Sequence, residues 1–194
     1  MQTKVKFLSS KRLIVGISGT SGVILGIRLL EELKKLKVET HLIVTETAEK
    51  IICYETKYAV KDVKRLADFY YDNKNFFSKV ASGSFKTSGM TIIPCSMKTL
   101  AGIANGYTDN LILRTADVCL KERRRTVLVV RETPLSLIHL NNMKTVTQAG
   151  GIIMPANLSF YSKPKNIDQM VDHIVGKVLD LFDINNNIYK RWDG

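Results

Sequence analysis

The chain has 194 residues, 45% of them hydrophobic and 24% charged, which is the composition of an ordinary globular domain. Its 29 basic and 18 acidic side chains give a net charge of +11, which favours anionic partners such as phosphorylated small molecules. No apolar run reaches the ~18 residues of a membrane span, and three scattered cysteines without C-x-x-C spacing argue against disulfides or zinc.

These totals predict one cytoplasmic domain over residues 1–194, with no membrane partner and no metal. Nucleic acid is also not expected as a partner, because the densest basic cluster, Lys121–Arg125, has no aromatic neighbours. A solvated basic surface accounts for most of the excess charge.

Residues 1–10 read as a short polar tail, and the chain is then organised around one glycine-rich turn. The buried run Arg12–Ser18 predicts a strand, and apolar spacing predicts a helix over Ser21–Lys35. The turn between them carries glycines at 16, 19 and 22, without the G-x-G-x-x-G or Gly-Lys-Ser/Thr patterns. Glycines and hydroxyls at a helix start suit the phosphate of a mononucleotide such as FMN. The alternative is a tight structural turn in which Ser21 caps the helix.

Further strands and helices alternate along the rest of the chain. Pro94 is expected to end the fourth strand, and Asn73–Gly89 has no regular pattern. The other strands are predicted at Glu39–Val44, Phe69–Tyr71, Met90–Ile93, Thr126–Val130 and Gly151–Met154. The other helices are predicted at Glu46–Tyr54, Val60–Ala67, Ser96–Gly106, Leu111–Glu122, Leu135–Ala149 and Ile167–Phe182. This alternation predicts an α/β fold with a parallel sheet between two helical layers.

Candidate functional residues follow the strands, at the edge where such sheets bind ligands. We expect this edge to gather fixed positive charge. Ser96 and Thr99 stand three residues apart at a helix start, where both hydroxyls can face one ligand. Arg131 and Glu132 follow a buried strand; they form either a structural salt bridge or a functional pair. In the functional interpretation Arg131 binds a phosphate or flavin oxygen and Glu132 transfers a proton.

Several spaced segments follow one another in one order from about Arg12 to the end of the chain. They are Gly16–Gly22, Tyr54–Thr56, Pro94–Ile103, Leu120–Arg124, Val130–Leu135, Phe160–Tyr161 and Arg191–Gly194. Together these segments resemble the UbiX flavin prenyltransferases. The resemblance implies a flavodoxin-like, Rossmann-like three-layer fold that binds FMN, usually as a homododecamer. The family joins the dimethylallyl group of dimethylallyl monophosphate to N5 and C6 of reduced FMN and releases phosphate. The product, prenylated FMN, passes to UbiD-type decarboxylases.

The resemblance also implies roles for individual residues. The FMN-binding residues would be Gly19, Thr20, Ser21, Thr45, Ser96, Met97, Lys98, Thr99 and Arg131. The prenyl phosphate would be held by Arg114, Lys121, Tyr161 and Lys177. Catalysis would involve Lys121, Glu132 as the acid for the leaving phosphate, Glu55 and Ser21 in proton movements, and Trp192 as a wall of the dimethylallyl pocket.

One residue departs from the family pattern, and two other interpretations remain. Lys177 stands where the family usually has arginine, so bidentate capture of the phosphate is lost. Related FMN-dependent cysteine decarboxylases share the fold but carry a different segment where this chain has Pro94–Thr99. A third possibility is a flavin-binding accessory subunit of a hydroxyarylic acid decarboxylase.

Overall fold

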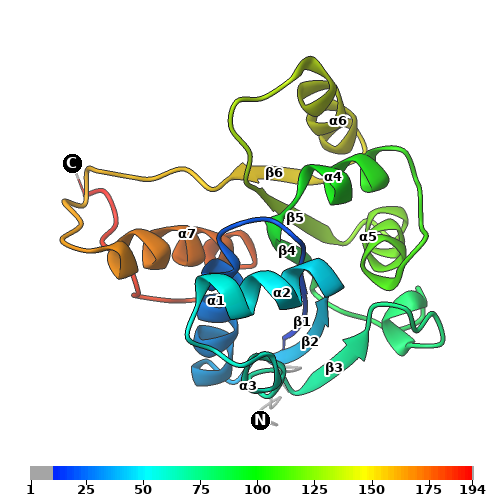
Figure 1. The fold of residues 1–194 in the computed structure, drawn as a ribbon, viewed down its shortest axis with the longest axis horizontal. Coiled ribbons are helices and arrows are strands. Elements are labelled where there is room, and N and C mark those ends of the chain that lie inside the picture. The colour runs from blue at the N-terminus through cyan, green and yellow to red at the C-terminus, as the bar shows by residue number, and fades with distance from the viewer. Residues whose placement is uncertain (1–10, 194) are drawn as a thin grey trace, which may run out of the picture.

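A computed structural model describes residues 11–193, and its centre is one parallel sheet of six strands (Figure 1). The strand order is β3-β2-β1-β4-β5-β6, the Rossmann-type order. Strands β2 and β3 are added on one side of β1, and strands β4 to β6 on its other side, so the order reverses between β1 and β4. The strands are β1 (Arg12–Ile17), β2 (Glu39–Val44), β3 (Phe69–Asp72), β4 (Gly89–Cys95), β5 (Arg125–Val130) and β6 (Ile152–Pro155). The expected α/β fold with a parallel sheet is confirmed.

Helices cover both faces of the sheet and enclose two apolar cores (Figure 1). One face packs against α1 (Val23–Lys35), α2 (Glu46–Glu55), α3 (Val60–Lys64) and α7 (Ile167–Leu181). The other packs against α4 (Met97–Ala104), α5 (Leu111–Lys121) and α6 (Leu137–Gln148). Alternate residues of each strand point to opposite faces, so β1 sends Leu13 and Val15 into the first core and Ile14 into the second.

The fourth strand is longer than the sequence predicts. β4 continues through Pro94 to Cys95, because its register against β5 shifts between Ile92 and Cys95. A proline lacks the N–H that a regular ladder needs, and an irregularity of this kind is where a strand tolerates one. The prediction that Pro94 ends the strand is therefore wrong by two residues.

Other boundaries differ by a few residues, mostly at helix ends. α3 ends at Lys64 rather than Ala67, and a short 3-10 helix, Lys79–Ala81, lies within the segment predicted to be irregular. β6 is displaced by one residue from its predicted range. The predicted polar tail at 1–10 lies outside the described residues, as does Gly194. Within 11–193, every helix is too short or too polar to cross a membrane.

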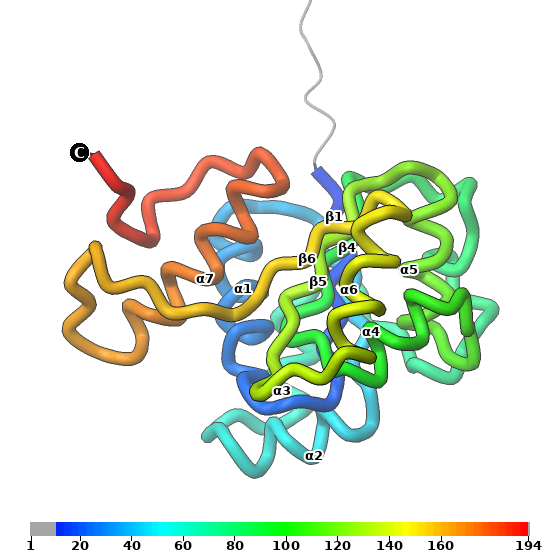
Figure 2. The backbone as a smooth tube through the Cα atoms, turned by 90° about the horizontal axis from the view of Figure 1, so that it is seen from above, coloured from blue at the N-terminus to red at the C-terminus, as the bar shows by residue number. Residues whose placement is uncertain are grey.

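The segment between β6 and α7 leaves the sheet as an extended arm over residues 156–166 (Figure 1). After α7, residues 182–193 form the C-terminal segment, which turns back and runs beside this helix toward the arm (Figure 2). The arm and the C-terminal segment therefore lie together, to one side of the sheet.

Candidate functional site

A cavity of about 810 Å³ lies at the carboxyl edge of the sheet, where β1, β2 and β4 end. The residues that follow these three strands converge there because parallel strands end at the same edge. Of the predicted site residues, it is lined by Gly19, Thr20, Thr45, Ser96, Met97, Lys98, Thr99 and Glu132. Seven of the nine predicted FMN-binding residues are thus brought together.

Two helix N-termini open onto this cavity. The side chain of Thr45 caps α2 by accepting from the Ala48 N–H at 3.2 Å, and Ser96 caps α4 by accepting from the Thr99 N–H at 3.3 Å. The first main-chain N–H groups of a helix have no intrahelical partner, and the helix dipole adds partial positive charge at the same place. Each of the two N-termini therefore offers N–H donors to a phosphate group in the cavity.

The glycine-rich turn approaches α2 so closely that Gly19 has no room for a side chain. A Cβ added to Gly19 would lie 2.5 Å from Cβ of Thr47, in the first turn of α2. Gly22 has a φ of 95° and occupies the N-cap position of α1 without a side-chain cap. Ser21 is therefore not the helix cap that the structural alternative required, and α1 begins at Val23.

Hydrogen bonds tie the loops after β1, β4 and β5 to one another. The buried hydroxyl of Ser18 donates to the Pro94 carbonyl at 3.0 Å and accepts from the Ser96 N–H at 2.8 Å. The Thr20 hydroxyl donates to the carbonyl of Arg131 at 3.3 Å, and Arg131 Nε donates to the Ser21 carbonyl at 3.2 Å. Ser21 and Arg131 do not line the cavity, but these bonds place them at its border. Arg131 is also not paired with Glu132, as the salt-bridge alternative would require.

Ser18 has a structural role that the sequence did not reveal. In the sequence, its hydroxyl lies in the glycine-rich turn whose hydroxyls suit a phosphate, but in the structure it is fully buried and both donates and accepts a hydrogen bond. The complete burial of Ser18 distinguishes it from a ligand-binding hydroxyl, and this burial cannot be inferred from the residue types of the turn.

Two carboxylates occupy distinct positions around this turn. Glu132 lines the cavity, and among residues 11–193 its carboxylate accepts only from the neighbouring Thr133 N–H, at 3.1 Å from Oε1. Glu55, at the end of α2, accepts from the Gly22 N–H at 2.9 Å. Glu132 is thus free to exchange a proton with a ligand, and Glu55 is held beside the glycine-rich turn.

The cavity is not the concentration of basic side chains that we expected. Its lining includes three lysines and five carboxylates, and one pair, Lys64 and Glu49, lies 2.8 Å apart as a salt bridge. The lysines are Lys64, Lys74 and Lys98, and the carboxylates are Glu46, Glu49, Asp72, Asp109 and Glu132. Positive potential for an anion therefore comes mainly from the helix N-termini and main-chain N–H groups.

The predicted prenyl-phosphate residues do not line this cavity. Arg114 pairs with Asp117 at 2.8 Å on α5, and Lys121 pairs with Glu122 where α5 ends. Tyr161 lies on the arm, Lys177 is exposed on α7, and Trp192 lies in the C-terminal segment. Tyr161 and Trp192 meet edge to face with their ring centroids 5.6 Å apart.

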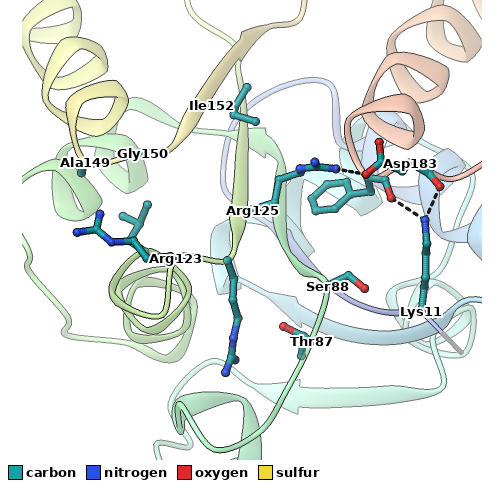
Figure 3. Close-up of a pocket in the computed structure, with 12 residues that line it drawn as sticks. Lys11, Thr87, Ser88, Arg123, Arg125, Ala149, Gly150, Ile152 and Asp183 are labelled. Atoms are coloured by element: carbon teal, nitrogen blue, oxygen red, sulfur yellow. Dashed lines mark hydrogen bonds and ion pairs between the residues drawn. The ribbon is translucent and has the colours of Figure 1, made fainter. Parts of the chain in front are cut away.

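A second cavity, of about 600 Å³, lies at the opposite, amino edge of the sheet and is lined by basic residues (Figure 3). Lys11 donates to the carbonyls of Phe182 and Asp183, and Arg125 pairs with the Asp183 carboxylate at 2.8 Å. Both cations therefore stabilise the C-terminal end of α7, where carbonyls lack partners. Arg124 likewise donates to the carbonyls of Gly83 and Phe85. Much of the basic cluster thus holds the main chain in place.

The cysteines and histidines form no reactive centre in the part of the chain that the structure describes. Burial raises the pKa of the Cys95 thiol and raises that of Cys119 to about 12, so both are packing residues. Within residues 11–193, no group of three His, Cys, Asp or Glu side chains is placed to hold a metal ion.

The family model for flavoproteins matches residues 2–191. A probable UbiX-like flavin prenyltransferase of Sedimentibacter hydroxybenzoicus is 48% identical over 184 residues, which cover 94% of this chain and 97% of that protein. The crystal structure of AnUbiX (PadA1) in complex with FMN and dimethylallyl pyrophosphate has a TM-score of 0.94 at 50% identity, covering 95% of this chain and 98% of that one. A dodecameric FMN-dependent UbiX-like decarboxylase from Escherichia coli O157:H7 has a TM-score of 0.93 at 47% identity, covering 94% and 100%.

Cysteine decarboxylases are similar in fold alone. The peptidyl-cysteine decarboxylase EpiD has a TM-score of 0.64 at 17% identity, covering 89% of this chain and 98% of that one. That level of identity carries no argument about substrate. The specific similarity is to the UbiX group.

Proposed function

Because this chain belongs to the UbiX flavin prenyltransferase family, we propose that it transfers a dimethylallyl group to reduced FMN. The bond between the allylic carbon and the phosphate oxygen breaks, and phosphate leaves. Reduced FMN supplies the nucleophilic atoms N5 and C6. The first new bond joins the allylic carbon to N5, which loses its proton. The second joins the far alkene carbon to C6, as the alkene π bond breaks, its other carbon gains a proton and C6 loses one. We treat residues 1–194 as one flavoprotein domain that performs this reaction.

The cavity at the carboxyl edge of the sheet is the single observation that carries the proposal. Its volume of about 810 Å³ is in the range of cofactor sites, and at Gly19 the turn carries no side chain and packs directly against Thr47. The capped N-termini of α2 and α4 suit a phosphate, so the residues present fit FMN. FMN would be held by Gly19, Thr20, Ser21, Thr45, Ser96, Met97, Lys98, Thr99 and Arg131.

The two carboxylates around the glycine-rich turn would handle protons. Glu132 lines the cavity without a cationic partner, so it can give a proton to the leaving phosphate. Glu55, anchored on the Gly22 N–H, would work with Ser21 in proton movements near the flavin ring. Neutralising the leaving group in this way lowers the barrier to breaking the allylic bond.

The donor would be bound by residues that several subunits contribute. Tyr161, Lys177 and Trp192 lie on the arm, on α7 and in the C-terminal segment, while Arg114 and Lys121 lie on α5. Since none of them lines the cavity of its own chain, we propose that neighbouring chains bring them to it. The dodecameric assembly of the Escherichia coli relative supports this arrangement, and we propose a homododecamer here.

The AnUbiX structure contains dimethylallyl pyrophosphate, and we propose the monophosphate as the preferred donor of this chain. Prenylated FMN would pass to a UbiD-type decarboxylase in the cytoplasm. A lysine at position 177 offers a point charge rather than a bidentate fork, which we expect to weaken donor binding relative to an arginine.

An anaerobic prenylation assay tests the function. Purified protein is mixed with dithionite-reduced FMN and with either dimethylallyl monophosphate or the diphosphate, and both phosphate and flavin mass are measured. We expect phosphate to appear together with a flavin heavier by one five-carbon unit, and faster from the monophosphate. FMN binding without transfer would favour an accessory subunit. Release of carbon dioxide from a peptidyl-cysteine substrate would favour a cysteine decarboxylase.

A further inference from the structure

A single carboxylate, that of Asp180 near the end of α7, anchors the C-terminal segment. Both terminal nitrogens of Arg191 donate to it, each at 2.7 Å, one to each oxygen. The Tyr189 hydroxyl donates to Oδ2 at 2.5 Å, and Asn186 Nδ2 donates to Oδ1 at 2.9 Å. Bidentate arginine–carboxylate pairs fix orientation as well as distance. Asp180 therefore defines where the segment from Asn186 to Arg191 lies.

The surface of α7 is shaped to receive this segment. A Cβ added to Gly176 would lie 2.2 Å from Cδ1 of Tyr189, so the absence of a side chain at 176 makes room for the tyrosine ring. His173, one turn earlier on α7, meets the Tyr189 ring edge to face at 4.8 Å between centroids. The tyrosine is thus held by its hydroxyl at Asp180 and by its ring at Gly176 and His173.

Further aromatic contacts connect His173 to Tyr161 and Trp192, the residues proposed to contact the donor. His173 also meets Tyr161 edge to face at 5.5 Å, and Tyr161 meets Trp192 at 5.6 Å with an angle of 87° between the rings. Trp192 is 70% exposed, so burial contributes little to fixing it. Its position depends instead on its neighbour in the chain, Arg191, and on its edge-to-face contact with the Tyr161 ring.

We infer that Asp180 is a positioning residue for prenyl transfer: by binding Arg191 it holds the neighbouring Trp192 in its edge-to-face contact with Tyr161, and so forms the aromatic wall of the donor pocket. The inference rests on the proposed function, in which Tyr161 and Trp192 contact the dimethylallyl donor. Asp180 itself would touch neither donor nor flavin. Its effect should therefore appear in donor binding and not in FMN binding.

The test uses the variant Asp180→Asn in the full chain, with Asp183→Asn as the matched control. Asp183 is also a carboxylate at the end of α7, but it pairs with Arg125 and not with the C-terminal segment. Trp192 is the only tryptophan, so its fluorescence anisotropy and quenching by acrylamide report its mobility directly. Steady-state kinetics of prenylation give KM for dimethylallyl monophosphate, and flavin titration gives Kd for FMN.

We expect Asp180→Asn to lower the Trp192 anisotropy and to raise KM for the donor about tenfold, with the Kd for FMN unchanged. Asp180→Glu should recover part of both effects, and Asp183→Asn should show neither. Unchanged Trp192 mobility in Asp180→Asn would overturn the inference, whether or not the wild-type protein transfers the prenyl group. Equal losses in donor and FMN binding would overturn it too, since they indicate a general structural role. Absence of transfer by the wild-type protein would instead overturn the proposed function.

Discussion

The hydroxyl of Ser18 accepts a hydrogen bond from the Ser96 N–H at 2.8 Å while donating to the Pro94 carbonyl at 3.0 Å. One buried side chain thus joins the turn after β1 to the turn after β4, on either side of the point where the strand order reverses. The spacing between the glycine-rich turn and the N-terminus of α4 depends on this contact.

Replacing Ser18 by alanine should therefore cost both stability and flavin affinity. The change leaves the part-buried Ser96 N–H without its partner and removes one of the two hydrogen bonds to the Pro94 carbonyl, which costs about 1–3 kcal/mol. Urea unfolding and FMN titration measure the two effects. Ser88→Ala is a suitable control, because Ser88 is exposed and its hydroxyl makes no hydrogen bond among the described residues. A stable Ser18→Ala protein with normal FMN affinity would show that the two turns are held apart by other contacts.

Gly19→Ala should weaken FMN binding by about tenfold or more, since the added Cβ must displace the first turn of α2. The obstructing atoms belong to the side chain of Thr47, with the nearest at 2.5 Å. Adding Thr47→Gly to Gly19→Ala should then recover part of the affinity. Isothermal titration of the two single variants and the double variant gives the coupling. Additive losses would mean that the clash is relieved elsewhere.

Glu132→Gln should slow phosphate release by about 100-fold or more, as expected for loss of a general acid, and leave FMN affinity nearly unchanged. The reason is that Glu132 lines the cavity but bonds only to its neighbour Thr133, so little structure depends on it. Single-turnover phosphate release and flavin titration separate the two effects. If both fell by the same factor, Glu132 would be a structural residue.

Acid should release the C-terminal segment. The hydrogen bonds from Arg191 hold the pKa of Asp180 at about 2, below its usual 3.8. A carboxylate whose pKa is lower in the folded state adds stability above its unfolded pKa, and that stability is lost as the pH falls from about 4 toward 2. Trp192 anisotropy should therefore fall over this range in the wild-type protein. Asp180→Asn, which has no carboxyl group to titrate there, should show no such transition, and a transition of equal size in both proteins would assign it to other groups.

How far the sequence predicts this molecule depends on the kind of feature. Buried apolar runs such as Arg12–Ser18 and Thr126–Val130 predict β1 and β5 to within a residue, because complete burial in a parallel sheet requires continuous apolar side chains. Ser96 is correctly predicted as the cap of α4. Pro94 is misread, since the register shift that admits it depends on the pairing of β4 with β5.

Some features of the candidate site could likewise be predicted from the sequence, and others could not. The residues that follow β1, β2 and β4 meet because topology requires it, so the sequence predicts their convergence. The near balance of charge in the cavity could not be predicted, because Glu46, Glu49 and Asp72 come from α2 and β3 rather than from the motifs. The role of Asp180 was equally hidden, since its partner Arg191 is eleven residues away and no local pattern links them.

The arm over residues 156–166 has one further consequence. If it carries Tyr161 into the cavity of another chain, a defect in one subunit can be compensated by its neighbour. Mixed oligomers of a Glu132→Gln chain and a Tyr161→Ala chain would then contain some intact centres, although neither parent has one. Such complementation, measured as regained turnover after co-refolding, would show that each active centre is built from more than one polypeptide. Its absence would mean that each centre is built from a single polypeptide.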